Sequence, residues 1–274
     1  LSAWYFFYFA FIGAFAPYFT LYLQSLGQSA FAIGVLMSLM QVMRLVAPNL
    51  WGWLADRTTE RVRILQFTAA AATVCFLPVL FPGGFGYLLL TMFAVHFFLT
   101  AQIPLVEAMT ATRLRDDPQA ARSYGRLRAW GSTSFVVTVL ATGLLLDGAG
   151  VGVHPWAVLA FFAATAAAAR LVRDAPHAPH VDAPVSVRDL FAQPRVRWFF
   201  LSVLLMIFAH GALYTYFSLH LAALGYSKSA IGVFWVLGVI VEIDGGDDAL
   251  GKDIAMHVAA SGAPGAIRPV CVSK

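Results

Sequence analysis

The chain has 274 residues, of which 60% are hydrophobic and only 12% are charged, and its mean hydropathy is +0.75. Soluble domains carry about 25% charged residues, so this composition excludes an ordinary soluble protein. The net charge of +4 does not indicate binding to nucleic acid, because the basic residues gather between apolar runs. These runs lack the alternation of a membrane barrel, so the expected fold class is an all-α integral membrane protein.

Seven apolar runs are long enough to cross a membrane, because about 20 helical residues span ~30 Å of hydrocarbon. Their connections are short, so successive helices are expected to be antiparallel neighbours. The runs are residues 3–23, 32–55, 64–81, 87–107, 127–146, 155–171 and 198–221. Aromatic residues near helix ends are predicted to anchor in the membrane interface: Trp4, Tyr22, Trp53, Tyr87, Trp156 and Trp198.

The basic residues predict the orientation in the membrane. Lys and Arg concentrate in residues 57–63, 113–128 and 170–197, whereas the alternate connections hold only Lys228. Basic loops stay on the cytoplasmic side. We therefore expect a multi-pass protein of the bacterial inner (cell) membrane with a cytoplasmic N-terminus and the lipid bilayer as its surroundings.

Arg44 is the most informative single charge. It lies 12 residues before Asp56, which places it ~18 Å along the helix from the cytoplasmic end. Arginine at that depth is costly and is expected to face a partner or a wet path. Gln41 and Pro48 share its helix face. The arrangement predicts a substrate path for an anion; the alternatives are a partner within the bundle or snorkelling to the interface.

The connection between the second and third runs carries a motif with Gly52, Asp56, Arg57, Arg61 and Arg63. It resembles the signature G-x-L-x-D-R-x-x-x-R-x-R of the major facilitator superfamily. By that resemblance these residues form a gating latch. Glycine permits close helix approach, and the aspartate accepts hydrogen bonds from basic groups or a helix N-terminus. The alternative is a basic cytoplasmic loop with one stray acid.

A narrower resemblance concerns Glu107 and Arg128, which end the fourth run and open the fifth. The surrounding residues are similar to the branch of lactose and phenylpropionate permeases. The resemblance implies that Glu107 and Arg128 pair across two helices and face the substrate path. Their separation is slightly longer than in the lactose permease, so Arg126 is the alternative partner. Interfacial charges at helix ends are the simpler interpretation.

Several residues are weaker candidates. Buried histidine more often joins helices than carries protons, and aromatic side chains mostly pack, although they are able to stack on an aromatic substrate. These candidates are His96, Gln102, Asn49, His210, Tyr8, Tyr18, Phe19, Tyr214 and Tyr216. Asp174, His177, His180 and Asp182 lie in a Pro-rich stretch that reads as a solvated linker rather than a metal site. No metal site, cofactor or enzyme motif is expected.

Residues 13–35 recur at 211–233, with 13 of 23 positions identical at a constant offset of 198. Such a repeat indicates a transporter of two parallel halves. The predicted organisation is a six-helix half over 1–171, a cytoplasmic linker over 172–195 and the start of a second half over 196–243, with helix 7 and part of helix 8. Residues 244–274 contain Asp244, Asp247 and Asp248 and are predicted to be a non-native or disordered tail of a truncated product.

The family resemblance implies alternating access and a proton as the coupling ion. The expected function is secondary active transport of a small organic solute, such as an aromatic carboxylate, by a monomer. Two alternatives stay open: a proton symporter for a sugar or nucleoside, and a truncated product that transports nothing.

Overall fold

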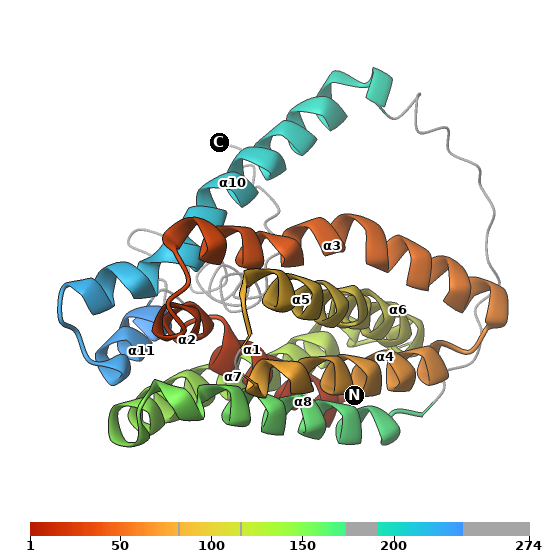
Figure 1. Cartoon of the computed structure of the whole chain (residues 1–274). Coiled ribbons are helices and arrows are strands. Elements are labelled where there is room, and N and C mark those ends of the chain that lie inside the picture. The colour runs from red at the N-terminus through yellow and green to blue at the C-terminus, as the bar shows by residue number, and fades with distance from the viewer. Residues whose placement is uncertain (82, 116, 174–190, 238–274) are drawn as a thin grey trace, which may run out of the picture.

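The computed structural model describes residues 1–81, 83–115, 117–173 and 191–237, and these residues contain helices and no strand. The expected all-α fold is confirmed. In chain order (Figure 1), the elements are α1 (Ser2–Phe15), α2 (Phe19–Ser25), α3 (Ala30–Thr58), α4 (Arg61–Phe76), η1 (Leu77–Leu80), α5 (Phe85–Leu99), α6 (Gln102–Leu114), α7 (Ala120–Ala149), η2 (Val151–Val153), α8 (His154–Arg170), α10 (Pro194–Ala223) and α11 (Lys228–Leu237).

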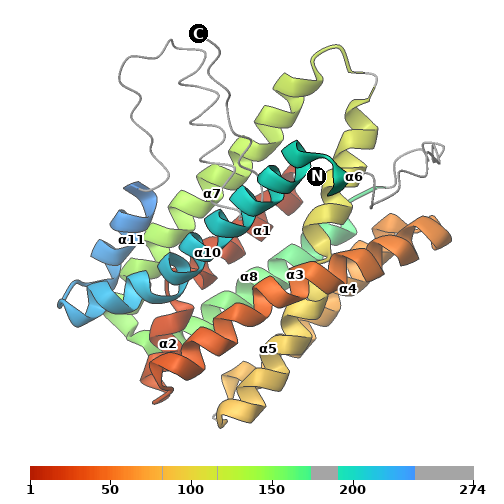
Figure 2. The ribbon, with the colours of Figure 1, turned by 90° about the horizontal axis from the view of Figure 1, so that it is seen from above.

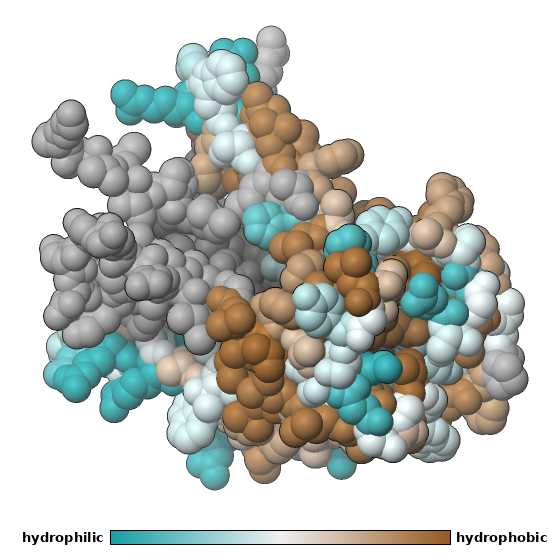
Figure 3. All heavy atoms as spheres, turned by 90° about the vertical axis from the view of Figure 1, so that its left-hand side faces the viewer, coloured by the Kyte–Doolittle hydropathy of each residue, from teal (hydrophilic) through white to brown (hydrophobic). Residues whose placement is uncertain are grey.

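Seven segments of the described chain are long and apolar enough to span a membrane, and they coincide with the seven predicted runs. Most extend further than hydropathy suggested, and α7 begins at Ala120 and α10 at Pro194. Large apolar side chains also reach the surface (Figure 3), as expected where lipid replaces water. The described part of the predicted linker is short, and residues 174–190 and the predicted tail lie outside the described residues.

Two of the seven described spans are each divided into two α-helices, and a proline lies at each division. Pro17 separates α1 from α2, whereas the equivalent residue in the repeat is Thr215, and α10 continues through it. In the fourth span, α6 begins just before Pro104, whose ring opposes the carbonyl of Thr100 four residues earlier, at the end of α5. Proline removes a helical donor and clashes with that carbonyl.

Helix α1 is the centre of the first half. It lies between α7 and α8 (Figure 2), and most of its side chains are buried. A Cβ atom added to Gly13 would lie 2.8 Å from the Phe135 carbonyl oxygen of α7, and one added to Gly131 would lie 2.6 Å from the ring of Phe9. Gly13 of the first span and Gly131 of the fifth therefore permit close packing of α1 against α7.

Two predicted interface anchors are wrong. Trp4 is fully buried and stacks on Tyr8 with ring centroids 4.7 Å apart. Tyr22 is also buried, and its hydroxyl donates to the Val79 carbonyl at 3.0 Å. Both belong to α1–α2, which the rest of the first half surrounds, so these rings pack in the core. The other four aromatic anchors are exposed.

The repeat is visible in the turns. Gly27 and Gly225, which are 198 residues apart, both have positive φ, at 77° and 86°. This left-handed conformation favours glycine. Each turn is followed by a serine whose hydroxyl oxygen accepts a hydrogen bond from a backbone N–H of the next helix: Ser29 from Ala32 at 3.2 Å, and Ser227 from Ala230 at 3.1 Å.

Candidate functional site

Arg44 occupies the middle of α3, 14 residues from Ala30 and 14 from Thr58 (44 − 30 and 58 − 44). Its Nη1 donates to Gln41 Oε1 at 3.2 Å, and its Nη2 lies 4.0 Å from the sulfur of Met40. Within the described chain no carboxylate lies within ion-pair distance of Arg44. The cation therefore stands at mid-membrane depth with only neutral partners.

Three neighbouring helices bring polar rings within electrostatic reach of Arg44. They are Tyr8 of α1, His96 of α5 and Tyr214 of α10, which belongs to the second half. The Tyr214 ring stacks on Trp235 with centroids 5.6 Å apart. A guanidinium with aromatic rings on neighbouring helices is suited to a planar anion, because the charge binds a carboxylate while rings contact apolar carbon.

The helix backbone adds an acceptor at the same level. Pro48 lies within α3 and has no N–H, so the Arg44 carbonyl lacks the hydrogen bond that residue 48 would normally donate. The backbone of α3 therefore has one carbonyl at this level without its usual helical donor. The hydrogen bond between Gln41 and Arg44 agrees with their predicted place on one face of α3, and Pro48 follows one turn later in the same helix.

His96 is fully buried, and neither ring nitrogen has a hydrogen-bond partner in the described structure. The expectation that it joins two helices by a hydrogen bond is therefore not met. Phe15 contacts the ring edge-on at 6.1 Å. Gln102 is buried nearby in the chain, and its Oε1 is also without a partner. Leaving a buried polar atom without a hydrogen bond lowers the stability of the fold by about 1–3 kcal/mol. His96 and Gln102 therefore do not stabilise the fold through hydrogen bonds of these atoms.

Glu107 pairs with Arg128, as the resemblance predicted. Arg128 Nη1 lies 3.1 Å from Glu107 Oε1. The Arg128 side chain is 13% exposed and that of Glu107 is 31% exposed. The Tyr124 hydroxyl donates to the other carboxylate oxygen at 3.0 Å. The guanidinium also lies over the Phe9 ring, 5.2 Å from its centroid. This pair ties α6 to α7 and α1.

The alternative partner, Arg126, does not pair with Glu107. It is exposed and lies near Asp117 in the connection before α7. Hydrogen bonds from the Ser123 hydroxyl and the Gln119 backbone N–H, with Arg126 nearby, hold the pKa of the Asp117 carboxyl below its usual value. Arg126 therefore belongs to the surface of this connection rather than to the cluster around Glu107.

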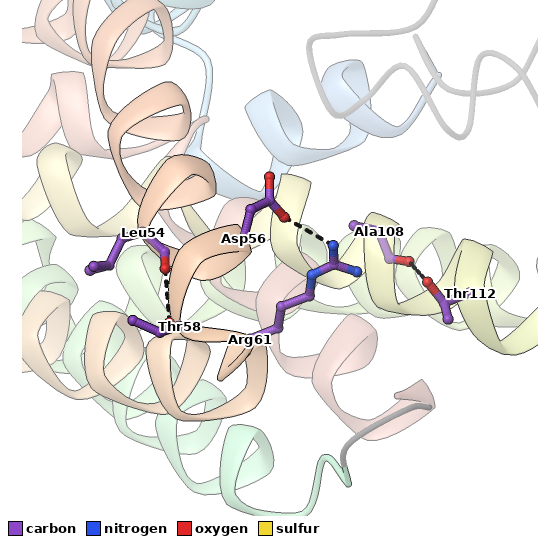
Figure 4. A network of polar contacts seen from close by, with 6 residues as sticks. All are labelled: Leu54, Asp56, Thr58, Arg61, Ala108 and Thr112. Carbon is purple, nitrogen blue, oxygen red and sulfur yellow. Dashed lines mark hydrogen bonds and ion pairs between the residues drawn. The ribbon is translucent and has the colours of Figure 1, made fainter. Parts of the chain in front are cut away.

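The signature turn forms a local ion pair (Figure 4). Asp56, near the end of α3, accepts a hydrogen bond from Arg61 of α4 at 3.0 Å. Arg57 lies instead over the Trp53 ring, 4.3 Å from its centroid, and Arg63 pairs with Glu60. The motif thus fixes the α3–α4 turn from within.

Gly52 differs from the expectation for this motif. A Cβ atom added there would meet no described atom within 4 Å. The predicted close helix approach at Gly52 is therefore absent from the described structure, because no described helix covers that face of α3.

The weaker candidates make contacts within their own helix or pack against neighbouring rings. Asn49 donates to the Leu45 carbonyl of its own helix at 2.8 Å, and His210 contacts the ring of Tyr214. Phe19 is buried against Phe15. His154, which sequence reasoning missed, is buried and bonds to the Ala14 carbonyl at 2.9 Å. Since Nε2 must donate there, this histidine links α8 to α1.

The bundle of long apolar helices, one of which carries Arg44 at its middle, defines a multi-pass membrane protein. Residues 1–244 match the family described as the MFS_1 like family. The chain belongs to this family and so to the major facilitator superfamily, as the signature around Asp56 predicted. Membership agrees with the expectation of a transporter rather than an enzyme.

Curated relatives agree with this placement. The chain is 29% identical to the "Probable 3-phenylpropionic acid transporter" of Escherichia coli (strain K12), over 89% of this chain and 64% of that protein. It is 31% identical to the "Maltose permease" of Geobacillus stearothermophilus, over 84% and 58%. The chain thus spans about 60% of the length of these relatives.

Solved structures support the fold. The nucleoside transporter NupG (D323A mutant) superposes with a TM-score of 0.66 at 16% identity, over 78% of this chain and 56% of NupG. This likeness concerns the fold alone.

A separate short match involves a different kind of protein. Over 37 residues, which are 14% of the chain, it is 62% identical to "Elongation factor Ts" of Nitrosomonas eutropha (strain DSM 101675 / C91 / Nm57), covering 10% of that protein. The family match leaves residues 245–274 uncovered.

Proposed function

We propose that this chain takes part in secondary active uptake of a small aromatic carboxylate by alternating access. The observation that carries the proposal is Arg44, a cation at mid-membrane depth with neutral partners and aromatic neighbours. A carboxylate would supply the missing countercharge, and Tyr8 and Tyr214 offer rings for its apolar part. The similarity to a phenylpropionic acid transporter supports the same substrate class.

We extend the proposal to coupling and placement. Proton symport rests on the resemblance to proton-coupled permeases. The basic connections support a cytoplasmic N-terminus, and the bacterial relatives support the inner membrane. We propose a monomer that requires no cofactor.

The test is accumulation of labelled 3-phenylpropionate in membrane vesicles that contain the 274-residue chain. We expect uptake to rise when the outside is more acidic than the lumen, and labelled maltose to stay outside. Ligand-induced thermal stabilisation of the purified chain should accompany uptake. Stabilisation without uptake would identify a chain that binds but does not transport, and absence of both would reject the proposal.

A neutral substrate is the competing function, because one relative is a maltose permease and the structural neighbour transports nucleosides. Neutral solutes do not need a central cation. Accumulation of maltose or a nucleoside, with no effect of phenylpropionate, would favour this alternative.

We also propose that residues 244–274 are foreign to the transporter fold. The family match ends at residue 244, and the segment that follows contains Asp247 and Asp248, which are costly in a membrane. A chain that ends at Ile243 should insert and melt like the 274-residue chain; a markedly lower melting temperature would contradict this.

A further inference from the structure

Two tyrosines join the two halves through the same contact made twice. The Tyr18 hydroxyl, between α1 and α2, lies 3.2 Å from the Lys228 carbonyl oxygen at the start of α11. The Tyr216 hydroxyl of α10 lies 3.1 Å from the Ala30 carbonyl oxygen at the start of α3. At the repeat offset of 198 residues, Tyr216 is the equivalent of Tyr18 and Lys228 is the equivalent of Ala30. Each half therefore donates to the equivalent carbonyl of the other.

The glycines of the repeat explain why the hydroxyls fit. A Cβ atom on Gly34 would lie 2.5 Å from the Tyr216 hydroxyl oxygen, and one on Gly232 would lie 2.4 Å from that of Tyr18. These glycines are also 198 residues apart. Each tyrosine tip thus rests against the equivalent glycine of the opposite half, where any side chain would displace it.

The acceptors are backbone atoms, so the contact does not depend on the side chain at position 30 or 228. This explains how alanine and lysine occupy equivalent positions, while the tyrosines and glycines are identical in both copies. The Tyr18 hydroxyl also lies 2.9 Å from the Val139 carbonyl oxygen of α7, so its one proton is shared between an acceptor in the first half and the Lys228 carbonyl of the second.

A third contact at the same end has no counterpart among the described residues. The Asp147 carboxylate, near the end of α7, accepts hydrogen bonds from the backbone N–H groups of Lys228 at 2.8 Å and Ser229 at 2.9 Å. It therefore caps the first turn of α11, where a negative charge is favourable. Helix α7 of the first half is thereby fixed to α11 of the second.

All three contacts lie at one end of the helices. Ala30 and Thr58 are the opposite ends of α3, so the carbonyl that Tyr216 binds is remote from the turn of Asp56 and Arg61. The start of α3, the end of α10 and α11 come together at this far end (Figure 1). With basic loops inside, this is the external end.

We propose that Tyr18 and Tyr216 form a reciprocal pair of clasps that closes the external end of the path, and that both must break when it opens outward. The proposal goes beyond the substrate assignment, because it does not depend on which solute is carried. Because the two clasps occupy equivalent positions in the repeat, the halves are held on both sides of the path and rock apart only when both release.

Each clasp is at most one hydrogen bond between neutral groups, and at Tyr18 the proton is shared with the Val139 carbonyl. Removing one hydroxyl should raise the ratio of open to closed molecules roughly two- to tenfold. Removing both should multiply the two effects, since the sites are separate.

The test measures the distance between two spin labels across the external end, in lipid nanodiscs. Ser25 and Ala223 are the equivalent exposed last residues of α2 and α10. Labels are attached to cysteines at these positions in the 274-residue chain, with Cys75 and Cys271 changed to serine.

Tyr18→Phe and Tyr216→Phe should each enlarge the population at longer label distance. Tyr22→Phe is the matched control, because it removes a buried hydroxyl whose bond to Val79 stays within the first half. If both clasp variants keep the wild-type distance distribution, or if Tyr22→Phe shifts it equally, the proposal is overturned.

A rescue experiment separates gating from loss of folding. Gly232→Ala should open the external end because its methyl group displaces the Tyr18 hydroxyl. Tyr18→Phe combined with Gly232→Ala should be less open than the product of the two single effects predicts, since the displaced oxygen is gone. If the open-to-closed ratio of the double variant equals the product of the two single effects, the contact between Gly232 and the Tyr18 hydroxyl does not control opening.

Discussion

Arg44→Gln should abolish high-affinity binding of 3-phenylpropionate while it stabilises the folded chain. Truncating one member of a buried charged pair typically costs 2–5 kcal/mol of binding, so affinity should fall by roughly 30-fold to several thousandfold. The free protein should gain stability because Arg44 has no carboxylate partner within the described residues. Arginine at mid-membrane depth costs about 2.5–3.5 kcal/mol on insertion scales.

Two measurements on one protein check this prediction. Ligand-induced thermal stabilisation reports affinity, and the melting temperature without ligand reports stability. Arg122→Gln is the control, because Arg122 is exposed in α7 near its first residue, and it should change neither. Arg44→Lys should retain part of the affinity, since it keeps the charge but not the bidentate geometry. Undiminished affinity in Arg44→Gln would remove the basis for an anionic substrate.

The sequence predicted the membrane spans because hydropathy and length control insertion. It did not predict that the first span breaks at Pro17 while its repeat continues at Thr215, since a hydropathy window averages over single prolines. The interface role predicted for Trp4 failed for a related reason. An aromatic residue near a helix end looks the same in sequence whether that helix faces lipid or lies at the centre of a bundle.

The candidate site was predictable where charge is involved. Arg44 and the Glu107–Arg128 pair stand out, because an ionised side chain within a membrane is costly and is found mainly where it has a partner or a function. The choice between Arg126 and Arg128 required the structure, since both lie on α7 within one turn. The tyrosine clasps were hidden because their acceptors are backbone carbonyls, which no residue type reveals. Only the repeat, with Tyr18 and Tyr216 conserved between its copies, pointed toward them.

Gly13→Ala and Gly52→Ala should have opposite effects on stability, although both place a methyl group on a helix glycine. Alanine favours a helix over glycine by about 1 kcal/mol, and this gain applies to both. At Gly13 the new Cβ would lie 2.8 Å from the Phe135 carbonyl oxygen. Because this is a backbone atom, α1 and α7 must separate, and overpacking costs about 1–3 kcal/mol. At Gly52 the space is open, so only the helical gain remains.

The comparison therefore isolates close helix packing from intrinsic helix preference. Urea or thermal unfolding of the detergent-solubilised chain should give Gly13→Ala a lower free energy of unfolding than the wild type, and Gly52→Ala an equal or higher one. Gly13→Leu should be worse than Gly13→Ala, because a larger side chain cannot enter between α1 and α7. If Gly13→Ala were as stable as Gly52→Ala, the tight contact between α1 and α7 would not exist in the membrane protein. The central position of α1, which carries Tyr8, would then have to be revised.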